Sequence, residues 1–105
     1  MGGKKSQRKG AAGERELAAI LQKHGYDCNR GGSLTFGEVP DLSGLPGIHI
    51  EVKRVEKLNV VEAMEQSIRD SERMHDGMPT LFHRRNRKPR LVTMRLEDWM
   101  RMYQK

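Results

Sequence analysis

The sequence contains one cysteine and no long apolar run, and each absence excludes a class of protein. Cys28 has no partner in the chain, which excludes an internal disulfide and a zinc site built from several cysteines. The longest apolar stretches are short pieces such as residues 17–21, too short for a transmembrane helix. Residues 1–10 are polar and basic with no apolar segment behind them, so we expect no secretory signal. These features favour the reducing cytosol.

Aromatic and hydrophobic residues are also scarce. Aromatic residues make up 5% of the chain and do not cluster, which argues against a platform that stacks the bases of RNA or single-stranded DNA. Hydrophobic residues make up 35%, charged residues make up 32%, and the mean hydropathy is -0.80. A chain of 105 residues with this composition predicts one domain with a thin core. We expect a partner to cover part of its surface.

Positive charge is abundant and lies in two runs. The chain has 20 Lys and Arg against 14 Asp and Glu, a net charge of +6, which is typical of a protein that binds a polyanion. Residues 1–10 hold one basic run, which we interpret as a flexible arm that precedes a single domain over residues 11–105. Residues 82–90 hold the other. One such run alone would indicate a solvated surface, but two runs around an acidic centre favour a nucleic-acid groove beside a metal site.

Hydrophobic periodicity predicts a mixed α/β domain in which helices pack on a sheet. In the first helix, Leu17, Ile20 and Leu21 share one face, and Gly25 is suited to end it. In the second, Val60, Val61, Met64 and Ile68 form the apolar face. The predicted helices cover residues 11–24, 59–75 and 96–102. The predicted strands cover residues 26–30, 39–43, 48–55, 80–84 and 90–94. The predicted order is α-β-β-β-α-β-β-α.

The strongest chemical signal lies in two of these strands. Glu51 and Lys53 are two residues apart on one strand, so both side chains point to the same face. A tight turn over residues 44–47 predicts a hairpin that brings Asp41 beside Glu51. Two carboxylates at one point repel each other unless a cation lies between them, and oxygen ligands favour Mg²⁺ or Mn²⁺ over zinc. Lys53 could hold an attacking water or neutralise charge on a phosphate.

The Glu-x-Lys pattern alone would indicate an ordinary solvent-facing strand. The upstream Pro40-Asp41 at hairpin distance supports the alternative interpretation, a site for phosphodiester hydrolysis. Both interpretations remain open from these residues alone.

A longer series of motifs carries a resemblance to a known family. The chain resembles archaeal-type Holliday junction resolvases and related phage nucleases of the PD-(D/E)xK superfamily over residues 9–54. The motifs that match in order and spacing are Lys9-Gly10, Glu14-Arg15-Glu16-Leu17, Arg30, Gly32-Ser33, Pro40-Asp41 and Ile50-Glu51-Val52-Lys53. The resemblance implies a restriction-endonuclease-like fold, in which helices flank a mixed sheet, and a bacterial or phage-infected host cell.

The resemblance also implies roles for particular residues. The metal ligands would be Asp41, Glu51, Glu14 and the backbone carbonyl of Val52, and Lys53 would be the catalytic lysine. Two further residues, Arg30 and Ser33, would lie near the scissile phosphate. We expect the DNA to contact these two residues and also Lys9, Arg84, Arg85, Arg87 and Lys88.

The chain is therefore predicted to be a Mg²⁺-dependent endonuclease, with Mn²⁺ as a substitute, selective for branched DNA. A nicking or restriction-type nuclease on duplex DNA and a non-catalytic basic DNA-binding module are the alternatives. We expect a homodimer, because paired cuts in a junction need two sites related by two-fold symmetry. The C-terminal residues Met94, Trp99, Met100 and Met102 either form the dimer contact or close the monomer's own core.

Several other polar residues are weaker candidates. Glu16 competes with Glu14 but lies on a different face of the same helix, and Glu38 points away from the face of Asp41. Gln66 is interpreted as an exposed helix amide. The four histidines lack zinc-ligand spacing and are predicted to lie on the surface or in the groove. One of them, His49, shares the face of Glu51.

Overall fold

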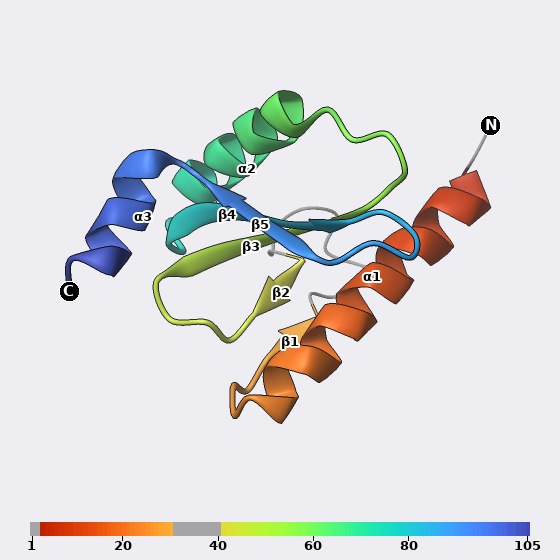
Figure 1. The fold of residues 1–105 in the computed structure, drawn as a ribbon, viewed down its shortest axis with the longest axis horizontal. Helices are drawn as coiled ribbons and strands as arrows, with labels where there is room; N and C mark the ends of the chain where they lie inside the picture. The colour runs from red at the N-terminus through yellow and green to blue at the C-terminus, as the bar shows by residue number, and fades with distance from the viewer. Residues whose placement is uncertain (1–2, 31–40) are drawn as a thin grey trace.

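The order of helices and strands in the computed structural model confirms the predicted topology (Figure 1). The structure describes residues 3–30 and 41–105, with the backbone alone for residues 3–10. The helices are α1 (Gly3–Lys23), α2 (Val60–Met74) and α3 (Leu96–Tyr103). The strands are β1 (Asn29–Arg30), β2 (Leu42–Ser43), β3 (Ile48–Arg54), β4 (Met78–Arg84) and β5 (Leu91–Met94).

The five strands form one mixed sheet in the order β1-β2-β3-β4-β5. Strands β3 and β4 are parallel, and the other neighbouring pairs are antiparallel. A parallel pair needs a long crossover, and α2 provides it. The central strand β3 is therefore paired on both sides. This makes β3 a rigid carrier for the side chains that it presents.

Helix α1 packs on one face of the sheet and supplies two of the four buried residues of the main core cluster. Leu17 and Ala18 of α1 are buried against Leu42 and Ile50 of the sheet. The periodicity of Leu17, Ile20 and Leu21 predicted this contact face. Helix α1 begins at Gly3, whereas the sequence analysis placed its start at residue 11. It therefore takes in residues 3–10, which were interpreted as an arm outside the helix. The division into an arm and a domain stays a prediction.

Helix α2 buries small side chains rather than large ones. Its buried residues are Ala63, Ser67 and Ser71, spaced four apart on one stripe. The expectation that Val61 belongs to the packed face was wrong, because this side chain is 70% exposed. The small side chains let α2 approach the sheet closely. That approach brings polar residues near the C-terminal end of α2 up to β3.

Specific polar contacts and backbone conformations set the ends of α2. The Asn59 side chain caps the N-terminus by accepting a 3.1 Å hydrogen bond from the backbone N–H of Glu62. At the other end, His75 adopts a left-handed conformation with φ of 52° and donates its backbone N–H to Ser71. The predicted helix over residues 59–75 therefore includes both capping residues.

The β2–β3 hairpin forms at the predicted turn. Leu42 pairs with Ile50, so the antiparallel register places Asp41 opposite Glu51. Gly44 has φ of 123°, and a Cβ there would collide with the backbone of Asp27 and Cys28. Glycine is therefore required where the hairpin passes close to the chain before β1.

Two predicted strands are shorter than expected in the described residues. Strand β1 contains only Asn29 and Arg30, and β2 contains only Leu42 and Ser43. Residues 39–40, where the second strand was predicted to begin, lie outside the described residues. No helix in the described part of the chain has the length and apolarity needed to cross a membrane.

Candidate active site

Asp41 directly precedes β2, and its carboxylate is held by the neighbouring strand β3. The backbone N–H of Val52 donates a 2.9 Å hydrogen bond to Asp41 Oδ2. Burial and the nearby carboxylates of Glu51 and Glu14 together raise the pKa of Asp41 to about 7, against the lowering effect of the Val52 hydrogen bond. Asp41 and Glu51 thus form a pair of adjacent, repelling acids, as the hairpin predicted.

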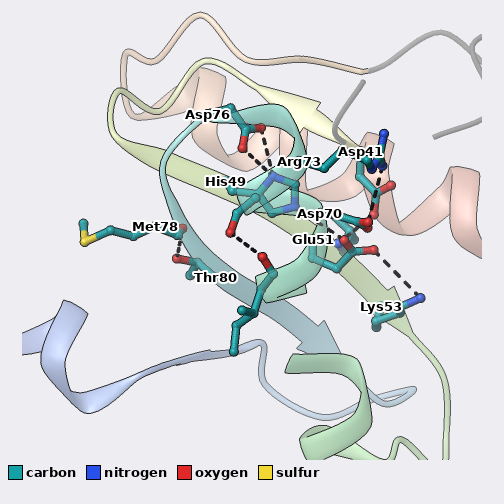
Figure 2. A network of polar contacts seen from close by, with 12 residues as sticks. Asp41, His49, Glu51, Lys53, Asp70, Arg73, Asp76, Met78 and Thr80 are labelled. Carbon is teal, nitrogen blue, oxygen red and sulfur yellow. Dashed lines mark hydrogen bonds and ion pairs between the residues drawn. The ribbon is translucent and has the colours of Figure 1, made fainter. Parts of the chain in front are cut away.

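Glu51 is the centre of the site. It is buried on β3, and its carboxylate lies 3.9 Å from Lys53 Nζ and 3.7 Å from His49 Nε2 (Figure 2). Lys53 is about one-third exposed, so its ammonium group can reach solvent or a bound phosphate. The prediction that Glu51 and Lys53 share one face of β3 is confirmed.

His49 is buried beside Glu51, and the prediction of a surface or groove histidine was wrong. Its side chain is 1% exposed. Its Nδ1 lies 2.8 and 2.9 Å from the two carboxylate oxygens of Asp76, which follows α2. Burial lowers the pKa of His49, but the Glu51 and Asp76 carboxylates outweigh that effect and raise it above its usual value.

Asp70 of α2 lies close to both His49 and Glu51. One oxygen of Asp70, one oxygen of Glu51 and one ring nitrogen of His49 all lie within 4.8 Å of one another. Asp70 Oδ1 also lies 3.3 Å from Arg73 Nη2. The sequence analysis missed Asp70 and Asp76. The only signal for them was that both lie at the end of the helix that crosses between β3 and β4.

Glu14 approaches the site from α1. Its Oε1 accepts a 3.1 Å hydrogen bond from Arg30 Nε. Its charge contributes to the raised pKa of Asp41, so Glu14 lies near the acidic pair. The structure therefore brings together Glu14, Asp41, Glu51 and Lys53 from three separate elements of the chain.

Comparison with known proteins identifies the family of the chain. The sequence profile of the archaeal Holliday junction resolvase (Hjc) family matches residues 5–103. The chain belongs to this family. Membership confirms the predicted class, a nuclease selective for branched DNA. None of the curated proteins matches the chain.

Among the solved structures that share the fold is one archaeal enzyme. It is Hjc from Archaeoglobus fulgidus, "a Holliday junction resolvase from an archaeal hyperthermophile", with a TM-score of 0.58. The match has 21% sequence identity and covers 77% of this chain and 72% of that chain. At this identity the match shows a common fold, which confirms the predicted restriction-endonuclease-like sheet.

Within this Hjc-family fold, Glu16 has a different environment from Glu14. Its carboxylate pairs with three arginines, namely Arg54 at 3.0 Å, Arg84 at 3.3 Å and Arg90 at 3.0 Å. These arginines come from β3, from β4 and from the residue just before β5. Glu16 therefore ties α1 to the basic edge of the sheet and is separate from the acidic pair.

The basic segment between β4 and β5 forms an exposed loop. Arg85, Arg87 and Lys88 are exposed, and Arg87 has φ of 61°. The backbone N–H of Asn86 donates a 2.7 Å hydrogen bond to Glu56, which anchors the loop. The three exposed side chains are thus available to DNA, whereas Arg84 is paired with Glu16.

The remaining candidates lie around or outside the site. Gln66 is exposed on α2, as predicted, and lines a surface depression with Lys53. His24 and His75 are exposed, and His83 is half-buried with Nε2 2.8 Å from Thr93 Oγ1. The predictions for Ser33, Glu38 and Pro40, and for the side chain of Lys9, fall outside the described residues.

Proposed function

We propose that this chain hydrolyses phosphodiester bonds of branched DNA with a divalent metal ion, Mg²⁺ or in its place Mn²⁺. The observation that carries the proposal is the position of Asp41 beside Glu51, where burial and mutual repulsion raise the pKa of Asp41 to about 7. Two acids in this arrangement are stabilised by a cation between them. Their oxygen donors fit a hard divalent ion.

The proposed ligands are the Asp41 and Glu51 carboxylates and the Val52 carbonyl, with Glu14 holding the ion or its waters. A bound ion would stabilise the negative charge that develops on the phosphate during hydrolysis. The Val52 N–H keeps the Asp41 carboxylate aimed at the site through its 2.9 Å hydrogen bond. This hydrogen bond therefore fixes the distance between Asp41 and the ligands on β3.

Lys53 supplies a positive charge on the solvent side of Glu51. From 3.9 Å away, its ammonium group is held near the acids yet remains one-third exposed. It would position the attacking water or neutralise the phosphate, while water attacks in line with the leaving 3′ oxygen. Arg30 and Ser33 are proposed to contact the DNA near the scissile phosphate.

We further propose that the chain acts as a homodimer with a second copy of itself. One chain contains one set of Glu14, Asp41, Glu51 and Lys53, so two matched cuts need two chains. Large apolar side chains are exposed on β5 and α3, including Leu96 at 72% and Trp99 at 46%. The Trp99 ring stacks on Tyr103 with centroids 4.9 Å apart. This exposed apolar surface includes part of the C-terminal segment predicted to form the dimer contact, and a second copy of the chain would cover it.

The deciding experiment compares a labelled four-way junction with a linear duplex of matched sequence, in Mg²⁺, Mn²⁺ or EDTA. We expect cleavage of the junction alone, only with a divalent ion. Asp41→Asn and Glu51→Gln should abolish cleavage and retain junction binding. Cleavage in EDTA would refute the metal mechanism. Equal cleavage of the duplex would indicate a nicking or restriction-type enzyme, and no cleavage by wild type would indicate a binding module.

A further inference from the structure

A second set of ligand-type atoms lies on the α2 side of Glu51. It consists of His49 and Glu51 from β3 and Asp70 from α2, with one ligand atom of each within 4.8 Å of the others (Figure 2). Neither Asp70 nor His49 belongs to the ligand set proposed above for Asp41 and Glu51. The question is whether this set is packed against itself or is arranged around an ion.

The orientation of His49 favours an ion. A carboxylate only accepts hydrogen bonds, so the 2.8 and 2.9 Å contacts with Asp76 place a proton on His49 Nδ1. The other ring nitrogen, Nε2, is buried and has no hydrogen-bond partner in the described part of the chain. A carboxylate that holds one nitrogen of a histidine, so that the other points into a site, is the usual support of a metal-bound histidine.

The distance to Glu51 also favours an ion. His49 Nε2 lies 3.7 Å from Glu51 Oε1, which is beyond a hydrogen bond. Two ligand atoms that each lie about 2.1 Å from one ion are separated by roughly 3–4 Å. A buried nitrogen at this spacing from a carboxylate is therefore positioned for a shared cation.

Asp70 is placed to complete the set. Its side chain is about one-quarter exposed, so a hydrated ion can reach it from solvent. Its present contact is Arg73, at 3.3 Å, and the Arg73 side chain is about half exposed. A divalent ion would compete with an arginine pair that is partly in solvent and therefore weak.

We propose that His49 Nε2, Glu51 and Asp70 bind a second divalent ion of transition-metal type, next to the ion proposed for Asp41 and Glu51. Asp76 orients His49. An imidazole ligand favours Mn²⁺ or Zn²⁺ over Mg²⁺, so this site differs in chemistry from its all-oxygen neighbour. Glu51 would join the two. The inference rests on the proposed function only in assuming that the neighbouring site also holds a metal ion. The ligands of the second site are argued independently of that function.

The test is Mn²⁺ binding to the metal-free protein over residues 1–105, without DNA. Calorimetry should give two Mn²⁺ per chain for wild type and one for Asp70→Asn, or a second site weakened at least about tenfold. Glu65→Gln removes an equal charge from an exposed position on the same helix and should leave both sites intact. Mn²⁺ binding by Asp70→Asn that equals wild type in number and affinity would overturn the proposal. One Mn²⁺ per wild-type chain that is lost in Asp70→Asn would support this site and argue against the neighbouring one.

Pulsed electron paramagnetic resonance separates this site from its neighbour. Only the proposed site has a nitrogen ligand, so bound Mn²⁺ should show coupling to ¹⁴N in wild type and in Asp41→Asn. The coupling should be lost in His49→Gln and reduced in Asp70→Asn at the same Mn²⁺ concentration. Because His49 is buried, the Asp70 variant keeps the test valid if His49→Gln does not fold. Absence of nitrogen coupling in wild type would refute the site even if the junction is cleaved.

Discussion

Asp41 Oδ2 lies 2.9 Å from the backbone nitrogen of Val52, so the strand that carries Glu51 and Lys53 also holds the carboxylate of its neighbour. This hydrogen bond takes the place of a strand pairing at the point where β2 begins. It fixes Asp41 beside Glu51 in spite of their repulsion. The folded protein thus maintains two acids in contact before any ion or DNA binds.

The stability of the metal-free protein should fall as pH rises from about 4 to about 7. The pKa of Asp41 is raised to about 7 in the folded state, so the folded chain keeps a proton that the unfolded chain releases near its ordinary value of 3.8. The loss is up to about 4 kcal/mol, since each pKa unit corresponds to about 1.4 kcal/mol. Urea unfolding across this range measures it.

The Asp41→Asn variant is the control for this pH dependence. His49 also titrates with a raised pKa, and its contribution falls in the same direction as pH rises. The difference between wild type and Asp41→Asn therefore isolates Asp41. Mg²⁺ should restore stability near pH 7 in wild type alone. An equal pH dependence in both proteins would contradict the prediction.

Lys53→Ala should lower the rate of junction cleavage by at least about 10²-fold, because a positioned charge in the transition state contributes roughly 3 kcal/mol. Lys53 is partly exposed and packs little, so the melting temperature should change little. Single-turnover cleavage at saturating protein measures the rate. Lys57→Ala, at an exposed position after the same strand, serves as the control. A wild-type rate for Lys53→Ala would show that Lys53 has no catalytic role.

Glu14 and Glu16 should give opposite phenotypes although they are two residues apart. Glu14→Gln removes a carboxylate near Asp41 and should slow cleavage about tenfold or more with little loss of stability. Glu16→Gln loosens the pairs with Arg54, Arg84 and Arg90 and should lower the free energy of unfolding by about 1–2 kcal/mol. Cleavage at saturating DNA should persist in Glu16→Gln. Cleavage and denaturation assays on both variants test these expectations. A stability loss in Glu14→Gln together with slow cleavage in Glu16→Gln would show that Glu16, and not Glu14, belongs to the active site.

The loop between β4 and β5 should contribute to the salt dependence of DNA binding. Replacement of Arg85, Arg87 and Lys88 by alanine removes three exposed charges and should flatten the slope of log K against log salt by up to about 3. Fluorescence anisotropy with a labelled junction measures the slope. Lys105→Ala removes one exposed charge outside the loop and should leave it unchanged. An unchanged slope in the triple variant would mean that the loop does not touch DNA.

Leu96→Glu should prevent dimer formation. Leu96 is 72% exposed on α3, so a charge there disrupts an apolar contact between copies without disturbing the core. Light scattering should give twice 12.1 kDa for wild type and 12.1 kDa for the variant. Val61→Glu introduces the same change at a 70% exposed position on α2 and should remain a dimer. A monomeric wild type at all concentrations, with and without DNA, would argue against paired resolution.

The local part of the site could be predicted from the sequence. The glycine turn over residues 44–47 defines a hairpin, and strand alternation then places Asp41, Glu51 and Lys53 relative to one another. These relationships span few residues and depend on backbone geometry, which sequence patterns encode directly. The order of helices and strands could be predicted for the same reason, because hydrophobic periodicity and turn residues are also local features of the sequence.

The tertiary structure alone decided which distant groups meet at that site. His49 was predicted as a surface or groove residue because the histidines lack zinc-ligand spacing. The stripe of small side chains on α2 lets that helix cover β3, and this brings Asp76 and Asp70 up to His49. Glu16 meets arginines from β3, from β4 and from the loop before β5 only because α1 crosses the sheet. Such contacts depend on how closely each helix packs against the sheet and on the rotation of the helix about its own axis. The sequence determines that packing through the combined volumes of many side chains, so it cannot be predicted from any single motif.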